Sequence, residues 1–493
     1  MIVGAQVPGS RGAAATGHAD ATEIALAVLD SGGTAADAAV AAVFALFALM
    51  PEACGLGGDA FALVGTPHES LSFNGSGDAP AEWIDSEAGA GAGAATATVP
   101  GAVAGLGELH ARFGTSDWAT LIAPAISLAE SGILVSSTLR AALERRSAIL
   151  DATARDWPVR QGQLSPTSKV TQPELASVLT SIATDGPAAF YKGWIGRELV
   201  SSARAAGGLL SEADLADHAT DVHPPVSIEV GDWTVQAPPP VSQGVLIPFT
   251  LRALHQVDRA GIPREHLMTE ALEEGFVWRP RLHDRSAVER LPWQWTPPAQ
   301  AARRLRGARG TGHTTSVCTA DPEGMVVSLL VSVFHEFGSG HLVPRLGFFL
   351  NDRALGFRDT HARRARRPVH TLSPALARSS TTCVGLATPG ADAQVQVLSQ
   401  VLDCVLHDRQ TWASAISRPR WRLEQSQLLI EDDARPTLVG ALQAWGHDVR
   451  IVPRRDHSMG AVTVAGWTRG TGVPEFSCFA FADGRRGSSA SQR

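Results

Sequence analysis

The sequence changes character once, and that change limits the folds open to this chain. From about Ala102 to Asp217 apolar residues recur with helical spacing, whereas Thr314–Ala320 and Met325–Val333 are β-rich runs separated by a turn sequence. Residues 280–313, between the two parts, carry Pro, Arg and Gly and few regularly spaced apolar positions. The pattern predicts an α+β protein with helices covering its sheets, and it predicts a flexible linker or processed tail over 280–313.

Two helices are predicted near the N-terminus. Asp20–Ser31 has helical spacing and stops at two glycines, and Thr34–Met50 starts with a good cap and is apolar nearly all round. The second helix should be fully buried, and its apolar stretch is shorter than the ~20 residues that cross a bilayer. Further predictions are a mobile loop at 85–97, a capping box at Ser211 and Asp214, a helix at Ala393–Leu406, and strands at Ala60–Val64, Trp233–Pro240, Leu372–Leu376, Thr382–Ala387 and within Ile451–Ala465.

Composition and charge exclude several classes of protein. The 493 residues are 44% hydrophobic and 18% charged with a net charge of −7, which is typical of a globular protein and gives no reason to expect a nucleic-acid partner. The five cysteines are odd in number and widely spaced without a CxxC pair, so neither a disulfide framework nor a zinc site is expected. No secretory signal or membrane span is visible, and we expect a cytoplasmic protein without a membrane partner.

The stretch Gly312–Val317 places small hydroxylated side chains at the start of a predicted strand, directly after the polar segment. On composition alone, a threonine-rich strand is typical of ordinary β-structure and identifies no site. The HExxH, GxSxG and P-loop motifs are absent from the sequence. We expect neither a metal nor a cofactor.

Short motifs follow one another in a fixed order along the chain. They are Gly32–Val40, Gly55–Gly58, Val99–Gly105, Pro124–Ile126 with Ala129 and Gly132, Gly207–Leu209 with Asp214 and Leu215, Pro238–Pro240 with Ser242 and Gly244, Thr314 with Thr315, Asp321 with Gly324, Phe337–Gly340, Ser373–Ala375, Thr388–Gly390 and Pro419–Trp421. Each motif is weak alone. In this order, and over almost the whole chain, they resemble the gamma-glutamyltransferase family of N-terminal nucleophile hydrolases.

The resemblance implies a fold and a processing event. The fold would be a four-layer αββα sandwich, and the precursor would cut itself before a threonine. The family's nucleophile matches Thr314, because Thr314 keeps the family's distance to the turn at Asp321–Gly324; Thr311 is the alternative register. A large subunit of residues 1–313 and a small subunit of residues 314–493 would then stay together.

The resemblance also implies a set of catalytic groups. The hydroxyl of Thr314 would first attack the His313 carbonyl to form an ester that water releases, and the freed α-amine, with a reference pKa of roughly 7.7–8.0, would then serve as its base. Ser332 matches a hydroxyl that hydrogen-bonds the nucleophile, and Thr315 matches a hydroxyl that orients the amine. The amides of Gly390 and Ala391 match the oxyanion hole; Ala391 would be strained if its φ were positive.

The family's clamp for the glutamate α-amino acid is not matched. The expected arginine is missing from Asn74–Pro80, where Asp78 would instead repel a carboxylate. The amine-binding aspartate is replaced by Gly356, and the neighbouring glutamine and asparagine are replaced by Arg353 and Phe334. Loss of several charged contacts should weaken glutamate recognition strongly.

The two carboxylate-binding serines of the family match His370 and Thr371. We therefore expect a small-molecule acyl amide as substrate, and Arg353 with His370 is a candidate anchor for an anionic acyl chain. Three functions stay open: a hydrolase or acyltransferase on another acyl amide, including a cephalosporin- or glutaryl-type acylase; a true gamma-glutamyl enzyme; and a catalytically silent homologue.

Overall fold

A computed structural model gives the fold of the chain. The structure describes seven stretches of the sequence: residues 11–85, 92–161, 169–257, 261–298, 312–359, 366–470 and 476–492. The predicted loop at 85–97 and the predicted linker at 280–313 lie in part outside these described residues.

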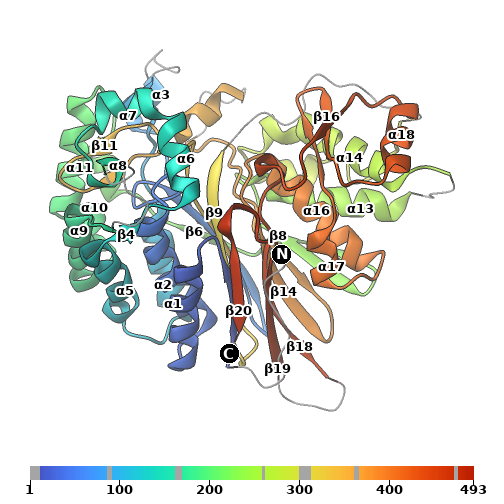
Figure 1. Cartoon of the computed structure of the whole chain (residues 1–493), viewed down its shortest axis with the longest axis horizontal. Coiled ribbons are helices and arrows are strands. Elements are labelled where there is room, and N and C mark those ends of the chain that lie inside the picture. Colours follow the sequence, from blue (N-terminus) through green and yellow to red (C-terminus); the bar gives the residue numbers. More distant parts are fainter. Residues whose placement is uncertain are drawn as a thin grey trace.

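Two antiparallel sheets stand face to face at the centre of the molecule (Figure 1). The first sheet has seven strands, in the order β20 (Ser489–Gln492), β1 (Ala13–Thr16), β9 (His313–Ala320), β10 (Val326–Phe334), β2 (Asp59–Gly65), β3 (Ser70–Gly75) and β6 (Asp221–His223). The second sheet has six strands, in the order β19 (Phe476–Ala482), β18 (Thr463–Arg469), β14 (Thr382–Ala387), β13 (Ala375–Arg378), β8 (Trp233–Ala237) and β7 (Val226–Val230).

Helices cover the outer face of each sheet (Figure 1). The first sheet packs against α1 (Ala19–Asp30), α2 (Ala35–Leu49) and α4 (Ala102–Phe113), and the second against α13 (Leu246–Gln256) and α16 (Ala393–Leu406). Next to α13 lies α14 (Arg264–Trp278). The molecule is therefore a four-layer αββα sandwich, as predicted.

The remaining elements extend the two helical layers. Beyond α2 and α4 lie α3 (Ala81–Asp85), η1 (Gly93–Thr96), α5 (Trp118–Ser131), α6 (Ser137–Arg145), α7 (Ser147–Thr153), α8 (Pro158–Gln161), α9 (Pro173–Asp185), α10 (Ala188–Lys192), α11 (Trp194–Ala205), α12 (Glu212–Ala216) and the strand pairs β4 (Ile133–Leu134) with β5 (Lys169–Val170) and β11 (Leu342–Val343) with β12 (Phe348–Phe349). Elsewhere in the chain are η3 (Gln243–Val245), η4 (Arg279–Arg281), α15 (Ala287–Arg290), η5 (Arg353–Asp359), α17 (Trp412–Ser417), α18 (Pro436–Ala444), η6 (His457–Met459), η7 (Arg485–Gly487) and a small sheet of β15 (Trp421–Glu424), β16 (Gln427–Glu431) and β17 (Val449–Val452).

The alternation of side chains along the strands explains the layers. On β2, Phe61 and Leu63 point into the core between the two sheets, while Ala60, Ala62 and Val64 point to the helices. On the helix side, α4 packs against β2, and α2 packs against the neighbouring strands β9 and β10. Every residue of α2 is buried, as its all-round apolar sequence predicts, because the helix lies between the sheet and the outer helices.

Several predicted elements are confirmed, and others need correction. The helix at Ala393–Leu406 and the strand at Thr382–Ala387 have the predicted bounds, and the Ser211–Asp214 capping box is formed. The linker prediction is wrong for residues 280–298, where α15 and neighbouring side chains such as Leu282 and Leu291 pack into the second core. The strand expected from Leu372 starts only at Ala375.

Strands from both sides of residue 314 are interleaved in each sheet. In the first sheet β1, β2, β3 and β6 precede it and β9, β10 and β20 follow; in the second, β7 and β8 precede it and β13, β14, β18 and β19 follow. A cut before residue 314 would thus leave two chains that share both sheets and the core between them. No helix in the described part of the chain is long and apolar enough to cross a membrane.

Candidate active site

Thr314 lies at the start of β9, at one end of the space between the sheets. Cys318 on this strand packs into the core between the sheets, and Ser316 meets Thr463 of the second sheet (Oγ to Oγ1, 2.9 Å). Because side chains alternate along a strand, Thr314 lies on this same inner face. Thr315 lies on the opposite face, where its hydroxyl donates to the sulfur of Met50 at 3.5 Å.

A chain of hydrogen bonds joins Thr314 to the peptide bond that precedes it. The Thr314 hydroxyl donates to Ser332 Oγ (3.3 Å), and the Ser332 hydroxyl donates to the carbonyl oxygen of His313 (2.6 Å). The backbone N–H of Phe334 also donates to Ser332 Oγ (2.9 Å). Irregular pairing of β9 with β10 between Val331 and Phe334 brings Ser332 to this position. The hydrogen bond from Ser332 to the His313 carbonyl is short, so it polarises the carbonyl of the His313–Thr314 peptide bond.

The Gly390–Ala391 segment lies beside the residues before Thr314. A Cβ atom added to Gly312 would meet the Ala391 Cβ at 2.9 Å. Both residues have positive φ, 126° for Gly390 and 50° for Ala391, so the strain anticipated for alanine is present. Neither of their N–H groups has a hydrogen-bond partner among the described contacts. These donors are therefore free to bind an oxygen atom.

A cavity of about 20 Å³ opens at Thr314. A cavity of this size has room for about one water molecule. Its lining comes from segments far apart in the sequence: Gly17; Met50, Glu52 and Ala53; Thr138; His313–Ser316; Pro389; His457 and Ala461; and Arg486 and Ser488.

His313, the residue on the other side of the peptide bond, is held by charged groups. Its Nε2 lies 3.0 Å from Glu336, which also forms an ion pair with Arg145 of α6 (2.6 Å). Burial, together with nearby cationic groups, lowers the pKa of His313. The imidazole is therefore neutral at pH 7 and lies beside the Glu336 carboxylate.

Arg353 and His370, two residues predicted to bind substrate, meet at a third residue that sequence reasoning missed. Asp59 Oδ2 lies 3.2 Å from Arg353 Nε and 3.0 Å from His370 Nε2, and all three side chains are fully buried. Asp59 pairs with Ser332 across β2 and β10, so its side chain lies on the same face of the sheet as that of Ser332. The trio therefore lies one strand away from the Thr314–Ser332 contact.

The polar side-chain atoms of these residues differ in how many of them have hydrogen-bond partners. Burial lowers the pKa of His370 to about 4, and its neutral ring donates to Asp59 and accepts from the N–H of Leu372 (3.2 Å). His370 thus has no ring nitrogen left for a ligand. Nη1 and Nη2 of Arg353 have no hydrogen-bond partner in the described structure. Only the arginine keeps free donors.

Phe334 covers the Arg353 guanidinium. The guanidinium carbon lies 4.1 Å from the centre of the Phe334 ring, a cation–π contact. Phe334 has a φ of 81°, a conformation that costs a bulky residue roughly 1–3 kcal/mol. Phe334 thus contacts both groups: its backbone N–H donates to Ser332 Oγ, and its ring packs against the Arg353 guanidinium.

The other two residues predicted to bind substrate are placed differently. Asp78 forms ion pairs with Arg366 (2.6 Å) and Arg367 (2.8 Å), so its charge is neutralised and would not repel a carboxylate as expected. Thr371 is buried, and its carbonyl accepts from the Ser373 hydroxyl (2.9 Å). None of the four residues predicted to bind substrate lines the cavity at Thr314.

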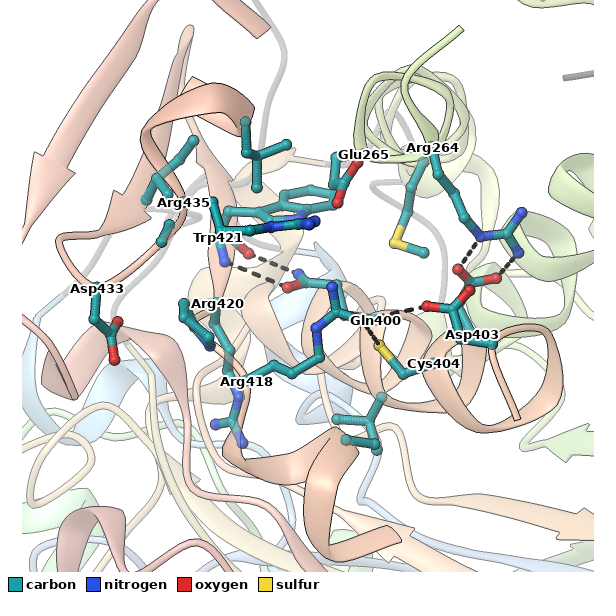
Figure 2. A pocket seen from close by; sticks show the side chains of 18 residues that line it. Arg264, Glu265, Gln400, Asp403, Cys404, Arg418, Arg420, Trp421, Asp433 and Arg435 are labelled. Carbon is teal, nitrogen blue, oxygen red and sulfur yellow. Dashed lines mark hydrogen bonds and ion pairs between the residues drawn. The ribbon is translucent and has the colours of Figure 1, made fainter. Parts of the chain in front are cut away.

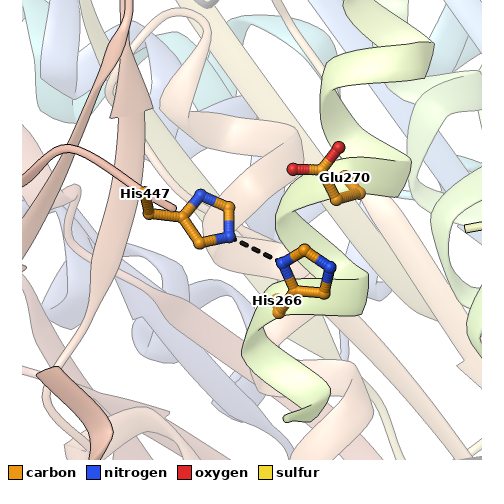
Figure 3. Close-up of side chains that lie close together, drawn as sticks. All are labelled: His266, Glu270 and His447. Atoms are coloured by element: carbon orange, nitrogen blue, oxygen red, sulfur yellow. Dashed lines mark hydrogen bonds between the residues drawn. The ribbon is translucent and has the colours of Figure 1, made fainter. Parts of the chain in front are cut away.

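Two other features lie in the second helical layer, away from Thr314. Figure 2 shows a cavity of about 310 Å³ in which Arg264 pairs with Asp403 and Arg418 contacts Cys404. Figure 3 shows His266, Glu270 and His447, whose potential ligand atoms lie within 4.8 Å of one another; it is the one such cluster among the described residues. His266 Nδ1 and His447 Nε2 share a hydrogen bond (2.8 Å).

The fold defines the class of protein. A four-layer αββα sandwich, with a hydroxylated residue at the start of a central strand and between the sheets, is the architecture of the N-terminal nucleophile hydrolases. The gamma-glutamyltranspeptidase family model matches residues 21–492. The chain belongs to that family, as its ordered motifs predicted.

Relatives of similar length support this assignment. The chain is 30% identical to the oxamate amidohydrolase proenzyme of Klebsiella pneumoniae, with 92% of this chain and 93% of that protein covered. It is 31% identical to the acylase ACY 1 proenzyme of Pseudomonas sp. strain SE83, with 92% and 90% covered. A solved cephalosporin acylase from Bacillus halodurans superposes with a TM-score of 0.85 at 24% identity, covering 99% of this chain and 97% of that one. The chain is thus an enzyme of a hydrolase family whose members include self-processing proenzymes.

Proposed function

We propose that the chain cuts itself between His313 and Thr314 and that Thr314 is the nucleophile of the resulting amidohydrolase. The observation that carries this proposal is the hydrogen-bond chain from the Thr314 hydroxyl through Ser332 to the His313 carbonyl. It places a hydroxyl nucleophile, its neighbour and the carbonyl to be attacked in one contact network. The two products would be residues 1–313 and 314–493, held together by the shared sheets.

After the cut, the freed α-amine of Thr314 takes the hydroxyl proton as the oxygen attacks the acyl carbon of a substrate amide. The free N–H groups of Gly390 and Ala391 stabilise the tetrahedral oxyanion, a contribution worth about 3–4 kcal/mol per donor in comparable sites. The amine then protonates the leaving nitrogen, and water hydrolyses the acyl ester. Ser332 holds the nucleophile, and Thr315 supports the backbone at the new terminus.

We propose that the acyl group is small and carries a negative charge. The two unpartnered nitrogens of Arg353 form a planar fork suited to a carboxylate. The guanidinium packs against the ring of Phe334, whose backbone N–H donates to Ser332. His370 holds Asp59, and Asp59 holds the guanidinium; both act as positioning residues. The names of two relatives, an oxamate amidohydrolase and an acylase, fit an acyl donor without the glutamate α-amino group.

Purified protein tests this function with matched amides: oxamate, a glutaryl anilide, a gamma-glutamyl anilide and a neutral butyryl anilide. We expect turnover of an anionic donor that lacks an α-amino group, and none by the Thr314→Ala variant. Preference for the gamma-glutamyl anilide would instead assign the chain to gamma-glutamyl chemistry. Equal turnover of the neutral anilide would contradict the role of Arg353.

A further inference from the structure

Glu52 is a buried acid beside Thr314 with no function in the steps described above. It lies in the loop between α2 and β2 and is 1% exposed. Hydrogen bonds tie this loop to the end of β10: the N–H of Phe337 donates to the Glu52 carbonyl (3.1 Å), and the N–H of Val333 donates to the Ala53 carbonyl (3.2 Å). The position of Glu52 is therefore fixed relative to Ser332 and Thr314.

The Glu52 carboxyl group is unpaired. Neither of its oxygens has a hydrogen-bond partner in the described structure, which is costly for a buried polar group. Glu52 lines the same 20 Å³ cavity as His313 and Thr314. The cavity has room for about one water molecule, which would satisfy the carboxyl and connect it to Thr314.

The surroundings favour the protonated acid. Burial raises the pKa of Glu52 to about 8; its own backbone N–H opposes the shift, the nearby Glu336 adds to it, and Arg145 opposes it. The other titratable groups that face it are Cys54 in the same loop and the cavity-lining His313, His457 and Arg486. Burial lowers the pKa of His457 to about 4 and that of His313 as well, so both histidines are neutral at pH 7.

Self-cleavage needs a proton donor that the mature enzyme does not need. Before the cut, the Thr314 nitrogen is part of a peptide bond, so it is neither a base nor a charged donor. It must gain a proton as its bond to the His313 carbonyl carbon breaks. The Ser332 hydroxyl is already engaged with the carbonyl oxygen of His313. Among the groups that line the cavity, Glu52 is the unpaired acid.

We infer that Glu52 is the acid–base group of self-cleavage and acts on Thr314 through the water that the cavity admits. The bond from Thr314 Oγ1 to the His313 carbonyl carbon forms, and the bond from that carbon to the Thr314 nitrogen breaks. Glu52 supplies a proton to the nitrogen through the water and is left as a carboxylate. The hydroxyl proton passes through Ser332 to the carbonyl oxygen and returns to solvent when the tetrahedral intermediate collapses.

The ester then reacts with water. Glu52, now a carboxylate, takes a proton from the attacking water, whose oxygen bonds to the His313 carbonyl carbon as the bond to Thr314 Oγ1 breaks. Thr314 Oγ1 takes from solvent a proton equivalent to the one released in the first stage, and Glu52 ends protonated as it began. The sum is addition of one water across the His313–Thr314 peptide bond, with no other reactant.

The test follows self-cleavage of the precursor in a time course after cell-free translation. Precursor and products are separated on gels at pH 6 to 9.5 for the wild type, Glu52→Gln and Glu52→Asp, with the exposed Glu69→Gln as control. We expect the wild-type rate to fall about tenfold per pH unit above about 8, as the acid form is lost. Glu52→Gln should cut at least tenfold more slowly at pH 7 and lack this fall. Glu52→Asp should keep the fall at an intermediate rate.

Cutting of Glu52→Gln at the wild-type rate, or with the wild-type pH profile, would overturn the inference. Equal rates for folded Glu52→Gln and Glu52→Asp would overturn it as well, and thermal unfolding shows whether each variant is folded. The inference rests on the proposed function, but the two fail differently. Cleavage of Thr314→Ala at the same bond refutes the proposed function, whereas a block in Thr314→Ala with normal cutting of Glu52→Gln refutes only the role of Glu52.

Discussion

Replacing Arg353 with glutamine should change which substrates the enzyme accepts more than how fast it turns them over. The two free guanidinium nitrogens would form two charge-assisted hydrogen bonds to a substrate carboxylate. Each such bond is worth about 1.5–3 kcal/mol, so their loss costs about 3 kcal/mol or more. At about 1.4 kcal/mol per tenfold change, kcat/KM for an anionic acyl amide should fall at least 100-fold. The value for a neutral acyl amide should change less than fivefold.

A structural side effect must be separated from this loss. Arg353 is the ion-pair partner of the fully buried Asp59, and removing one partner of such a pair costs about 3–5 kcal/mol of stability. Asp59→Asn combined with Arg353→Gln removes both charges and should restore much of that stability without restoring anionic substrates. Arg264→Gln, which breaks an ion pair with Asp403 in the other helical layer, is the matched control.

The assay is the ratio of kcat/KM for a glutaryl anilide to that for a butyryl anilide, measured on processed protein. The ratio is insensitive to the fraction of folded enzyme, because both substrates use the same site. We expect it to fall at least 100-fold in Arg353→Gln and in the double variant, and to stay at the wild-type value in Arg264→Gln. A ratio unchanged in a folded Arg353→Gln variant would refute the assignment of Arg353 as the acyl anchor.

Three further results are expected. Ser332→Ala removes the donor to the His313 carbonyl and should slow self-cleavage by about 100-fold or more. Intact mass measured over time gives the rate, and a wild-type rate would show that Ser332 has no part in the reaction. Glycine tolerates the positive φ at position 391, so Ala391→Gly should leave the melting temperature and the self-cleavage intact. Valine does not tolerate it, so Ala391→Val should lower the melting temperature. Equal melting temperatures of the two variants would contradict the strain. The pKa of Glu52 in the folded protein is raised to about 8, so the contribution of Glu52 to the free energy of unfolding is complete below pH ~4.5 and is lost as the pH rises to about 8. Denaturant titrations at several pH values should show this loss in the wild type and a smaller loss in Glu52→Gln. The same pH dependence of the unfolding free energy in both proteins would contradict the shift.

The sequence predicts well those features that depend on local pattern. The all-round apolar α2 lies buried between two layers, and α16 and β14 begin and end where their spacing and turns indicated. Such features follow from periods of 3.6 and 2 residues and from turn chemistry. Ser332 was expected beside Thr314 only because of the resemblance to the family, and the antiparallel register of β9 and β10 brings the two hydroxyls together.

Features that depend on contacts between distant segments were missed. Asp59, Arg353 and His370 are far apart in sequence, and no local pattern links them, so the residue that joins the other two was not foreseen. Residue type alone could not show that two nitrogens of Arg353 lack hydrogen-bond partners while both ring nitrogens of His370 have them. Glu52 was overlooked because a lone glutamate after a helix is ordinarily a solvated side chain, and only the packing of its loop against β10 buries it.

The linker prediction failed for a different reason. Residues 280–298 contain few apolar side chains at regular spacing, yet Leu282 and Leu291 are nearly fully buried in the second core. A few anchoring side chains suffice to hold a segment whose remaining residues stay polar. Composition averages over such anchors and therefore predicts a tail where the structure has a short helix.

The most direct measurement of the central claim is the intact mass of the protein purified at neutral pH, with Thr314→Ala beside the wild type. Self-cleavage at Thr314 predicts two wild-type polypeptides of residues 1–313 and 314–493 that co-purify, the second with threonine as its N-terminal residue. The Thr314→Ala variant should remain a single chain of 493 residues. A wild-type protein that stays intact, or a variant that is still cut after His313, would contradict the claim.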